Sequence, residues 1–226
     1  MKQRAHVVLI PVIINIIGMV VGGLTVQGQS VEFAQAGAAE SADIYLSVAV
    51  AGGFPEVRGM SLAGQAVSRS HADNSVGGAL KVGIFPQWTQ RALGIELEYF
   101  GTTGKVSALT SHNGSVAEGK ASLTVLNSMV NLVLRQPSGA FRPYGGLGIG
   151  YSGGILYRAD FPGRANREFD STPGFAYQFL GGLQWDVGTR TFLFAEYKHL
   201  VTAFHWKGLS LDYRANYILA GWGWSF

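Results

Sequence analysis

The feature of this sequence that most constrains its fold is a strict alternation of side-chain types over residues 92–100. The apolar positions are Leu93, Ile95, Leu97 and Tyr99, and the positions between them are Gly94, Glu96 and Glu98. Because successive side chains of a β-strand point to opposite faces, this stretch predicts a strand with one apolar face and one face carrying two carboxylates. Few windows of the chain show apolar residues at helical spacing for more than two turns, so the sequence predicts an all-β fold.

The same period of two recurs along the chain and predicts eight strands. These strands are expected at residues 43–54, 76–85, 92–100, 119–134, 141–153, 173–186, 191–201 and 211–226. Each is about as long as a tilted strand that crosses a bilayer, or a little longer. The connections alternate in length, with long ones at 55–75, 101–118 and 154–172, short ones at 86–91, 135–140 and 187–190, and a medium one at 202–210. We expect the long connections to be solvated loops and the short ones tight turns, as in an up-and-down barrel.

The size of the side chains on the two faces distinguishes a membrane barrel from a soluble one. Over residues 141–153, bulky residues such as Leu147 and Ile149 alternate with Gly146, Gly148 and Gly150. A glycine face buries little apolar area, but it suits the narrow interior of an eight-stranded barrel whose apolar face meets lipid. We therefore predict an eight-stranded antiparallel up-and-down transmembrane β-barrel. The alternative is a soluble periplasmic barrel of the lipocalin type, which predicts an apolar interior.

Strand parity places a set of polar side chains inside this barrel. The expected interior polar network consists of Lys81, Glu96, Glu98, Arg142, Gln178, Gln184, Glu196 and Lys198. Buried charges are tolerated when they are paired, and the interior of eight strands is just wide enough for side chains. We expect a polar plug that holds the strands together, and an ion path is the alternative.

The first 36 residues have the layout of a secretory signal. Basic residues precede an apolar run from Val7 to Val21, and Ala34-Gln35-Ala36 provides an A-x-A cleavage site. We expect residues 1–36 to be removed and residues 37–226 to form the barrel domain. A cut after Gly28 and an uncleaved membrane anchor are the alternatives.

Composition excludes several classes of function. The formal net charge of +3 is too small to indicate binding to nucleic acid. The chain contains no cysteine, which excludes disulfides, thiolate metal sites, thiol catalysis and a lipid attached to an N-terminal cysteine.

The best enzymatic candidates are His199, His205, Ser210 and Asp212, near the expected outer ends of the last two strands. A Ser/His/acid group at that rim would hydrolyse lipid. The spacing of these residues is not diagnostic, and polar residues are ordinary near lipid headgroups. We therefore expect no enzymatic activity, with a lipid-modifying hydrolase as the alternative.

No cofactor or metal is expected. The segment Gly148–Gly153 matches the dinucleotide fingerprint G-x-G-x-x-G, but no helix pattern follows it, and such a helix is what binds the pyrophosphate. The histidines at positions 71, 112, 199 and 205 lack the spacing of metal ligands.

Three segments resemble the opacity/OmpA-type family of eight-stranded outer-membrane proteins. They are Tyr144–Tyr151, Leu193–Lys198 and Gly221–Phe226. The resemblance covers the mature chain and implies the bacterial outer membrane. In that family the last strand is the signal for the outer-membrane assembly machinery, and the matching residues here are Ile218, Ala220, Trp222, Trp224 and Phe226. Members include structural proteins, adhesins and a few enzymes, so the resemblance specifies architecture and location more closely than activity.

Together these features predict a non-enzymatic outer-membrane barrel with a structural or surface-interaction role through its extracellular loops. A narrow channel is a further alternative. The expected partners are outer-membrane lipids and lipopolysaccharide, the outer-membrane assembly machinery and a host or surface ligand on the loops, with no nucleic acid. The charged segment Arg158–Asp170 is a candidate contact surface for lipopolysaccharide or a host molecule, and an ordinary solvated loop is the alternative.

Overall fold

The computed structural model describes residues 42–226 apart from 63–64, 68, 113–114 and 161–166. The expected signal segment at residues 1–36 lies outside the described residues, so its cleavage stays a prediction. Within the described part of the chain, no helix is both long enough and apolar enough to span a membrane.

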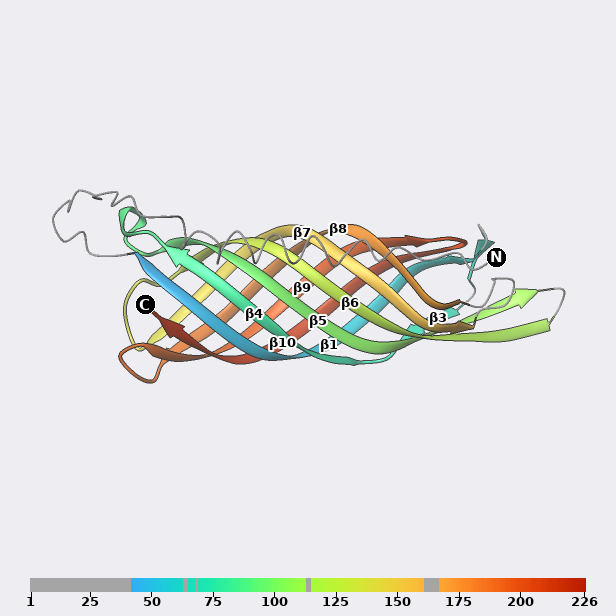
Figure 1. The fold of residues 1–226 in the computed structure, drawn as a ribbon, viewed down its shortest axis with the longest axis horizontal. Coiled ribbons are helices and arrows are strands. Elements are labelled where there is room, and N and C mark those ends of the chain that lie inside the picture. The colour runs from blue at the N-terminus through green and yellow to red at the C-terminus, as the bar shows by residue number, and fades with distance from the viewer. Residues whose placement is uncertain (1–41, 63–64, 68, 113–114, 161–166) are drawn as a thin grey trace, which may run out of the picture. The chain divides into compact units, whose positions relative to one another are not determined.

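Eight long antiparallel strands form the wall of a closed barrel (Figure 1). They are β1 Asp43–Leu62, β4 Ser75–Phe85, β5 Leu93–His112, β6 Ser115–Arg135, β7 Phe141–Asp160, β8 Arg167–Asp186, β9 Thr191–Trp206 and β10 Leu209–Ser225. Each strand pairs with its neighbours in chain order, and β10 pairs back with β1, which closes the ring. The predicted fold class, an eight-stranded antiparallel up-and-down barrel, is therefore confirmed.

Three short elements accompany the ring. Strand β2, Gln65–Ala66, pairs with the end of β1, and strand β3, Arg69–Ala72, pairs with β5. A single 3-10 turn, η2, spans Gln87–Thr89 between β4 and β5.

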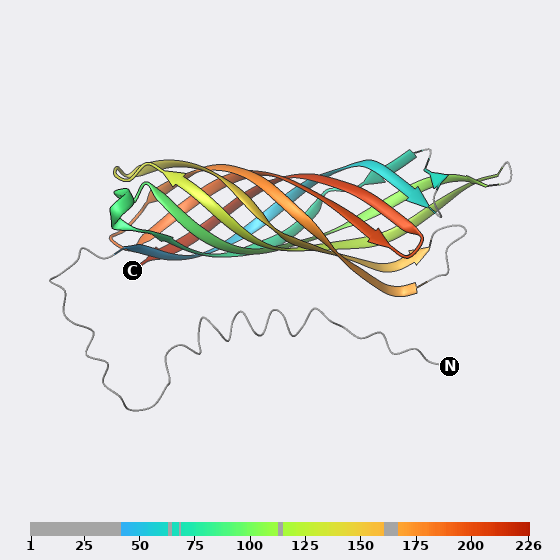
Figure 2. The ribbon, with the colours of Figure 1, turned by 90° about the horizontal axis from the view of Figure 1, so that it is seen from above.

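The two ends of the barrel differ. The connections 86–92, 136–140 and 187–190 lie at the end where the barrel chain starts and where it finishes at Phe226, which we call the turn end (Figure 2). There the backbone N–H of Phe226 donates to the carbonyl of Ile44 at 2.8 Å. We call the opposite end, where β5 joins β6 and β9 joins β10, the outer end.

The strands are much longer at the outer end than the sequence analysis predicted. The expected loops at 55–75, 101–118, 154–172 and 202–210 are wrong, because most of their residues continue the strands. Strands β5 and β6 stay paired as far as His112 and Ser115, and β9 and β10 are joined through Lys207 and Gly208 alone. Gly208 has a φ of 75°, a left-handed conformation that glycine adopts without steric cost.

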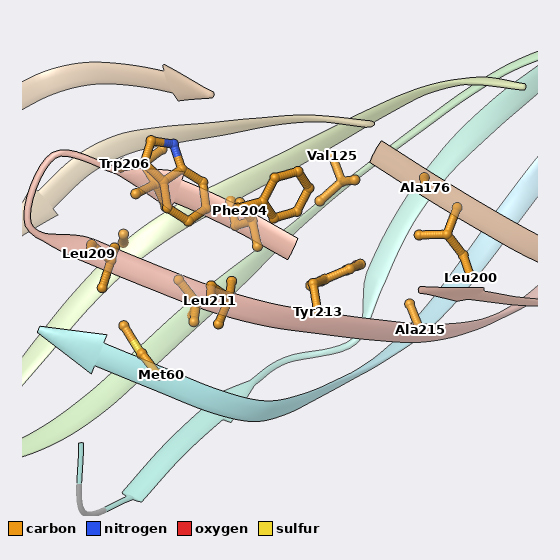
Figure 3. Close-up of a cluster of buried hydrophobic side chains, with 14 of the residues drawn as sticks. Met60, Val125, Ala176, Leu200, Phe204, Trp206, Leu209, Leu211, Tyr213 and Ala215 are labelled. Carbon is orange, nitrogen blue, oxygen red and sulfur yellow. The ribbon is translucent and has the colours of Figure 1, made fainter. Parts of the chain in front are cut away.

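The polarity of the alternation reverses along the barrel. In the half nearer the turn end, every strand exposes bulky apolar side chains, exemplified by Val48, Val82, Ile95, Leu132, Ile149, Phe179, Tyr197 and Ile218. Inside that half, an apolar cluster that includes Tyr45, Phe85 and Phe192 lies beside buried charged residues. In the outer half the exposed face carries more polar residues, and the inward side chains are mostly apolar and pack into a core that includes Phe204, Trp206, Leu211 and Tyr213 (Figure 3). One half of the barrel is thus built for contact with lipid, and the other half is built like a soluble barrel.

Candidate functional site

Five charged side chains from β4, β5 and β9 meet inside the barrel. This charge network consists of Lys81, Glu96, Glu98, Glu196 and Lys198, and each of these side chains is at most 5% exposed. The ammonium of Lys81 lies 2.6 Å from Glu196 and 3.4 Å from Glu96. The ammonium of Lys198 lies 2.9 Å from the other carboxylate oxygen of Glu196 and also contacts Glu98. Three carboxylates therefore share two ammonium groups where water is largely excluded.

Neutral side chains donate further hydrogen bonds to these carboxylates. The donors that surround the charge network are Tyr45, Asn131, Tyr144 and Gln178. The amide nitrogen of Asn131 lies 2.8 Å from Glu96 and 3.1 Å from Glu98, and that of Gln178 lies 2.9 Å from Glu98. The phenol of Tyr45 donates to Glu96, and that of Tyr144 donates to the oxygen of Glu196 that Lys81 also contacts. The additional donors compensate for the excess of carboxylates over cations.

A second charged cluster lies closer to the turn end. It contains Asp43, Arg135, Arg142, Gln184 and Asp186. The guanidinium of Arg142 lies 2.5 Å from Asp186, and that of Arg135 lies 2.6 Å from Asp43. Arg142 and Gln184, which the sequence analysis grouped with the lysines and glutamates, have their polar contacts here. They are cross-strand partners near the ends of β7 and β8, and Gln184 also pairs with Phe194, which lies two residues before Glu196, so both lie on the turn-end side of the charge network.

The cavity beside the charge network is small. A cavity of about 20 Å³ next to the charge network, lined by Tyr45, Phe85 and Tyr144 among others, has room for about one water. Beyond the network, the apolar core fills the outer half. The interior contacts among the described residues can therefore hold the strands together.

Several residues of these clusters were missed by the sequence analysis. Asn131 and Arg135 lie on β6, whose inward face also carries Met129 and Val133. Because both faces of residues 119–134 contain many apolar side chains, the pattern did not distinguish inside from outside. The sequence did contain one indication: Asn131 and Arg135 lie an even number of positions apart, so they lie on the same face of a strand.

The expected assembly-signal residues lie on the outer surface of β10. Ile218, Ala220, Trp222, Trp224 and Phe226 are all exposed. The rings of Trp222 and Trp224 stack with centroids 6.1 Å apart. They lie on the strand that closes the barrel against β1, and their role as a signal stays a prediction.

The candidate hydrolase residues also lie on the outer wall. His205 and Ser210 are cross-strand partners, and Asp212 is two residues further along β10. No hydrogen bond joins His205 to Ser210 among the described residues. His199 lies six residues away on β9 and contacts Asn216, with 2.8 Å between its Nδ1 and the amide oxygen. The structure therefore does not bring the four residues together as a catalytic group.

The glycine-rich segment Gly148–Gly153 lies within β7, paired on both sides with β6 and β8. A Cβ added to Gly148 would lie 2.9 Å from Gln178, so this glycine leaves room for the network. No helix follows this segment in the described chain, so it cannot bind a pyrophosphate as the fingerprint does. Among the described residues, no group of three or more His, Asp or Glu side chains is placed to hold a metal ion.

Comparisons with known proteins support the fold. No family model matches the chain, and no curated protein matches it. Among solved structures, Neisserial surface protein A aligns at 12% identity over 81% of this chain and 97% of its own, with a TM-score of 0.52. The outer membrane protein OprG from Pseudomonas aeruginosa aligns at 15% identity over 82% of this chain and 96% of its own, with a TM-score of 0.55.

These likenesses concern the fold, since the identities are low. The predicted resemblance to opacity/OmpA-type eight-stranded barrels is confirmed at that level. This chain therefore has the fold of these outer-membrane β-barrels, and the half nearer its turn end has an apolar exterior.

Proposed function

We propose that the protein is a non-enzymatic outer-membrane barrel with a closed interior, which holds a stiff β-sheet wall at the cell surface as a surface for interaction. The observation that carries this proposal is the change in polarity of the outward side chains along the strands. The half nearer the turn end exposes apolar residues that suit lipid, and the outer half exposes polar residues over an apolar core.

Strand length supports the same conclusion. A tilted strand needs about 9–11 residues to cross the hydrocarbon layer. Strands β5, β7 and β8 have 20 residues each and β6 has 21. About half of each of these four strands therefore extends beyond the membrane, where the pairing of β5 to β8 and the apolar core hold it.

The expected partners follow from the surfaces of this barrel. Outer-membrane lipids, including lipopolysaccharide, would surround the apolar half, and the outer-membrane assembly machinery would recognise the strand that ends at Phe226. Surface contacts of a structural or adhesive kind would involve the strands of the outer half and the hairpin ends that join them. The filled interior argues against conduction of ions.

Single-cysteine labelling tests this arrangement cleanly, because the chain has no cysteine. Lys207→Cys places a thiol at the outer end, and Ser138→Cys places one in the turn between β6 and β7; both positions are exposed. In intact cells, a membrane-impermeant maleimide should label Cys at 207 and not at 138, and both should react after lysis. Equal labelling at both positions in intact cells would contradict the proposed orientation.

Two further measurements test the membrane barrel and its closed interior. The unheated protein should stay in the membrane fraction during carbonate washing and should migrate faster on gels than the boiled protein. Purified barrel should give no steady conductance in planar bilayers. Release into the soluble fraction would contradict the membrane location, and a reproducible single-channel conductance would contradict the closed interior.

A further inference from the structure

A basic groove lies on the outer wall of β5, β6 and β7, away from the interior clusters. Its volume is about 500 Å³, and its charged lining residues are Asp73, Lys105, Lys120 and Arg158. Lys105 and Lys120 face outward, because their chain neighbours Val106 and Ala121 are buried in the apolar core. Pockets of this size accommodate ligands as large as a disaccharide.

The two lysines are held close together by the pairing of β5 and β6. Lys105 pairs with Ser122, and Ser107 pairs with Lys120, so the lysines are diagonal neighbours on one face. Diagonal neighbours in an antiparallel pair are about 7–8 Å apart. Long side chains at that spacing can bring both ammonium groups to one phosphate, or to two phosphates on one headgroup.

Arg158 reaches the groove through an irregularity of β7. The register between β6 and β7 shifts between the pairs Lys120↔Asp160 and Ser122↔Tyr157, and Arg158 lies within that shift. Its φ of 50° is a left-handed conformation that non-glycine residues adopt at an energetic cost. Bulges of this kind redirect a side chain, and here the redirected residue is the third cation of the groove.

Charge and position together indicate the ligand. Among the described residues that line or border the groove, three are cations and two are carboxylates, those of Asp73 and of Asp160. Tyr157, the neighbour of Arg158, is exposed and packs edge to face with Phe169, their ring centroids 5.5 Å apart. Exposed aromatic residues of barrels gather at the level of lipid headgroups, which is where lipid phosphates lie.

We propose that this groove binds the phosphate groups of an outer-leaflet glycolipid, as lipopolysaccharide carries them. The proposal rests on the outer-membrane location given under Proposed function. Lysine and arginine would make charge-assisted hydrogen bonds to the phosphate oxygens. The carboxylate of Asp73 would accept hydrogen bonds from sugar hydroxyls, and the hydroxyls of Ser107 and Ser122 would both donate to them and accept from them.

The test compares two double variants of the full chain, purified as folded barrels in detergent. Lys105→Gln/Lys120→Gln removes two charges from the groove, and Arg190→Gln/Arg214→Gln removes two exposed charges elsewhere on the barrel. Binding of fluorescent lipopolysaccharide is followed by anisotropy. We expect the groove variant to bind about tenfold more weakly or worse, and the control variant to stay within about twofold of the native protein.

Two further ligands, tested on the native barrel, identify the chemical source of the phosphate. Lipopolysaccharide stripped of its phosphates should bind the native barrel as weakly as intact lipopolysaccharide binds the groove variant. Inorganic phosphate at millimolar concentration should compete poorly; complete competition would assign the groove to free phosphate and overturn the lipid assignment. Equal affinities of the native protein and the groove variant, or an equal loss in the control, would overturn the proposed site.

Failure of the site and failure of the proposed function are distinguishable. A variant that still shows heat-modifiable mobility and the expected cysteine labelling, but unchanged lipopolysaccharide binding, rejects the groove alone. Arg158→Asn provides an independent check, because asparagine tolerates the left-handed conformation while removing the charge. It should weaken binding severalfold without changing the gel mobility, and unaltered binding would exclude Arg158 from the site.

Discussion

Replacing Lys198 with methionine should lower the free energy of unfolding by about 3–5 kcal/mol, the usual cost of removing one partner from a buried ion pair. Lys198 is fully buried, and its ammonium contacts Glu98 and Glu196. Methionine fills most of the volume of the lysine stem, so the expected loss comes from charge more than from packing. Without Lys198, three carboxylates would face the ammonium of Lys81 alone.

The second half of this prediction concerns the double variant Glu98→Gln/Lys198→Met. It removes one carboxylate along with the ammonium, and a glutamine at position 98 can still accept hydrogen bonds from Asn131 and Gln178. The double variant should therefore be more stable than the sum of the two single changes predicts, by about 2 kcal/mol or more.

The assay is urea unfolding of the barrel in detergent micelles, followed by the mobility of unheated protein on gels and by tryptophan fluorescence. Lys207→Met is the matched control, because Lys207 is exposed in the turn between β9 and β10, and its replacement should change stability by at most about 0.5 kcal/mol. If the stability losses of the two single variants sum to that of the double variant within about 0.5 kcal/mol, Glu98 and Lys198 do not interact energetically. The proposed sharing of charge within the network is then wrong.

Three further predictions concern packing and assembly. Gly154→Ala should destabilise the barrel by about 1–3 kcal/mol in the same assay, because its Cβ would lie 2.7 Å from Trp206, whereas Gly52→Ala, with nothing within 4 Å, should be neutral. Phe204→Ala should cost about 3–5 kcal/mol, since this ring is fully buried in the apolar core; a loss below 1 kcal/mol would mean that the core does not stabilise the outer half. Phe226→Ala should reduce the assembled protein in cells severalfold and leave the stability of refolded barrel unchanged, because this residue is 72% exposed; an unchanged amount in cells would reject the assembly role.

The strands of the membrane half could be predicted because their alternation is simple. Outward positions such as Ile95 and Leu97 are apolar, and inward positions such as Glu96 and Glu98 are polar, so both the period and the parity are clear from the sequence. The continuation of β5 to His112 was missed, because its outward residues become polar and glycine appears within it. That composition is typical of loops as well as of strands that face water on one side.

The interior and the groove show a second limit of sequence reasoning. Parity places Lys81 and Arg142 on the inner face alike, but contacts depend on position along the barrel axis, which strand tilt and register determine. In the same way, parity places Lys105 and Lys120 outward, and only the register of β5 against β6 makes them neighbours. Arg158 depends on a local shift in register, for which the sequence carries no regular pattern.

The reversal of polarity along the strands also explains how an interaction surface can stand above a membrane without flexible loops. A two-stranded hairpin in water is marginally stable, so isolated extensions of β5 and β6 would fray. Packing the extensions together around Phe204, Trp206 and Tyr213 buries apolar area that no hairpin could bury alone. Residues on this wall, including the cations of the groove, are therefore held at fixed spacing. Substitutions in the apolar core should consequently alter surface binding at a distance, whereas insertions at the hairpin ends should leave it intact.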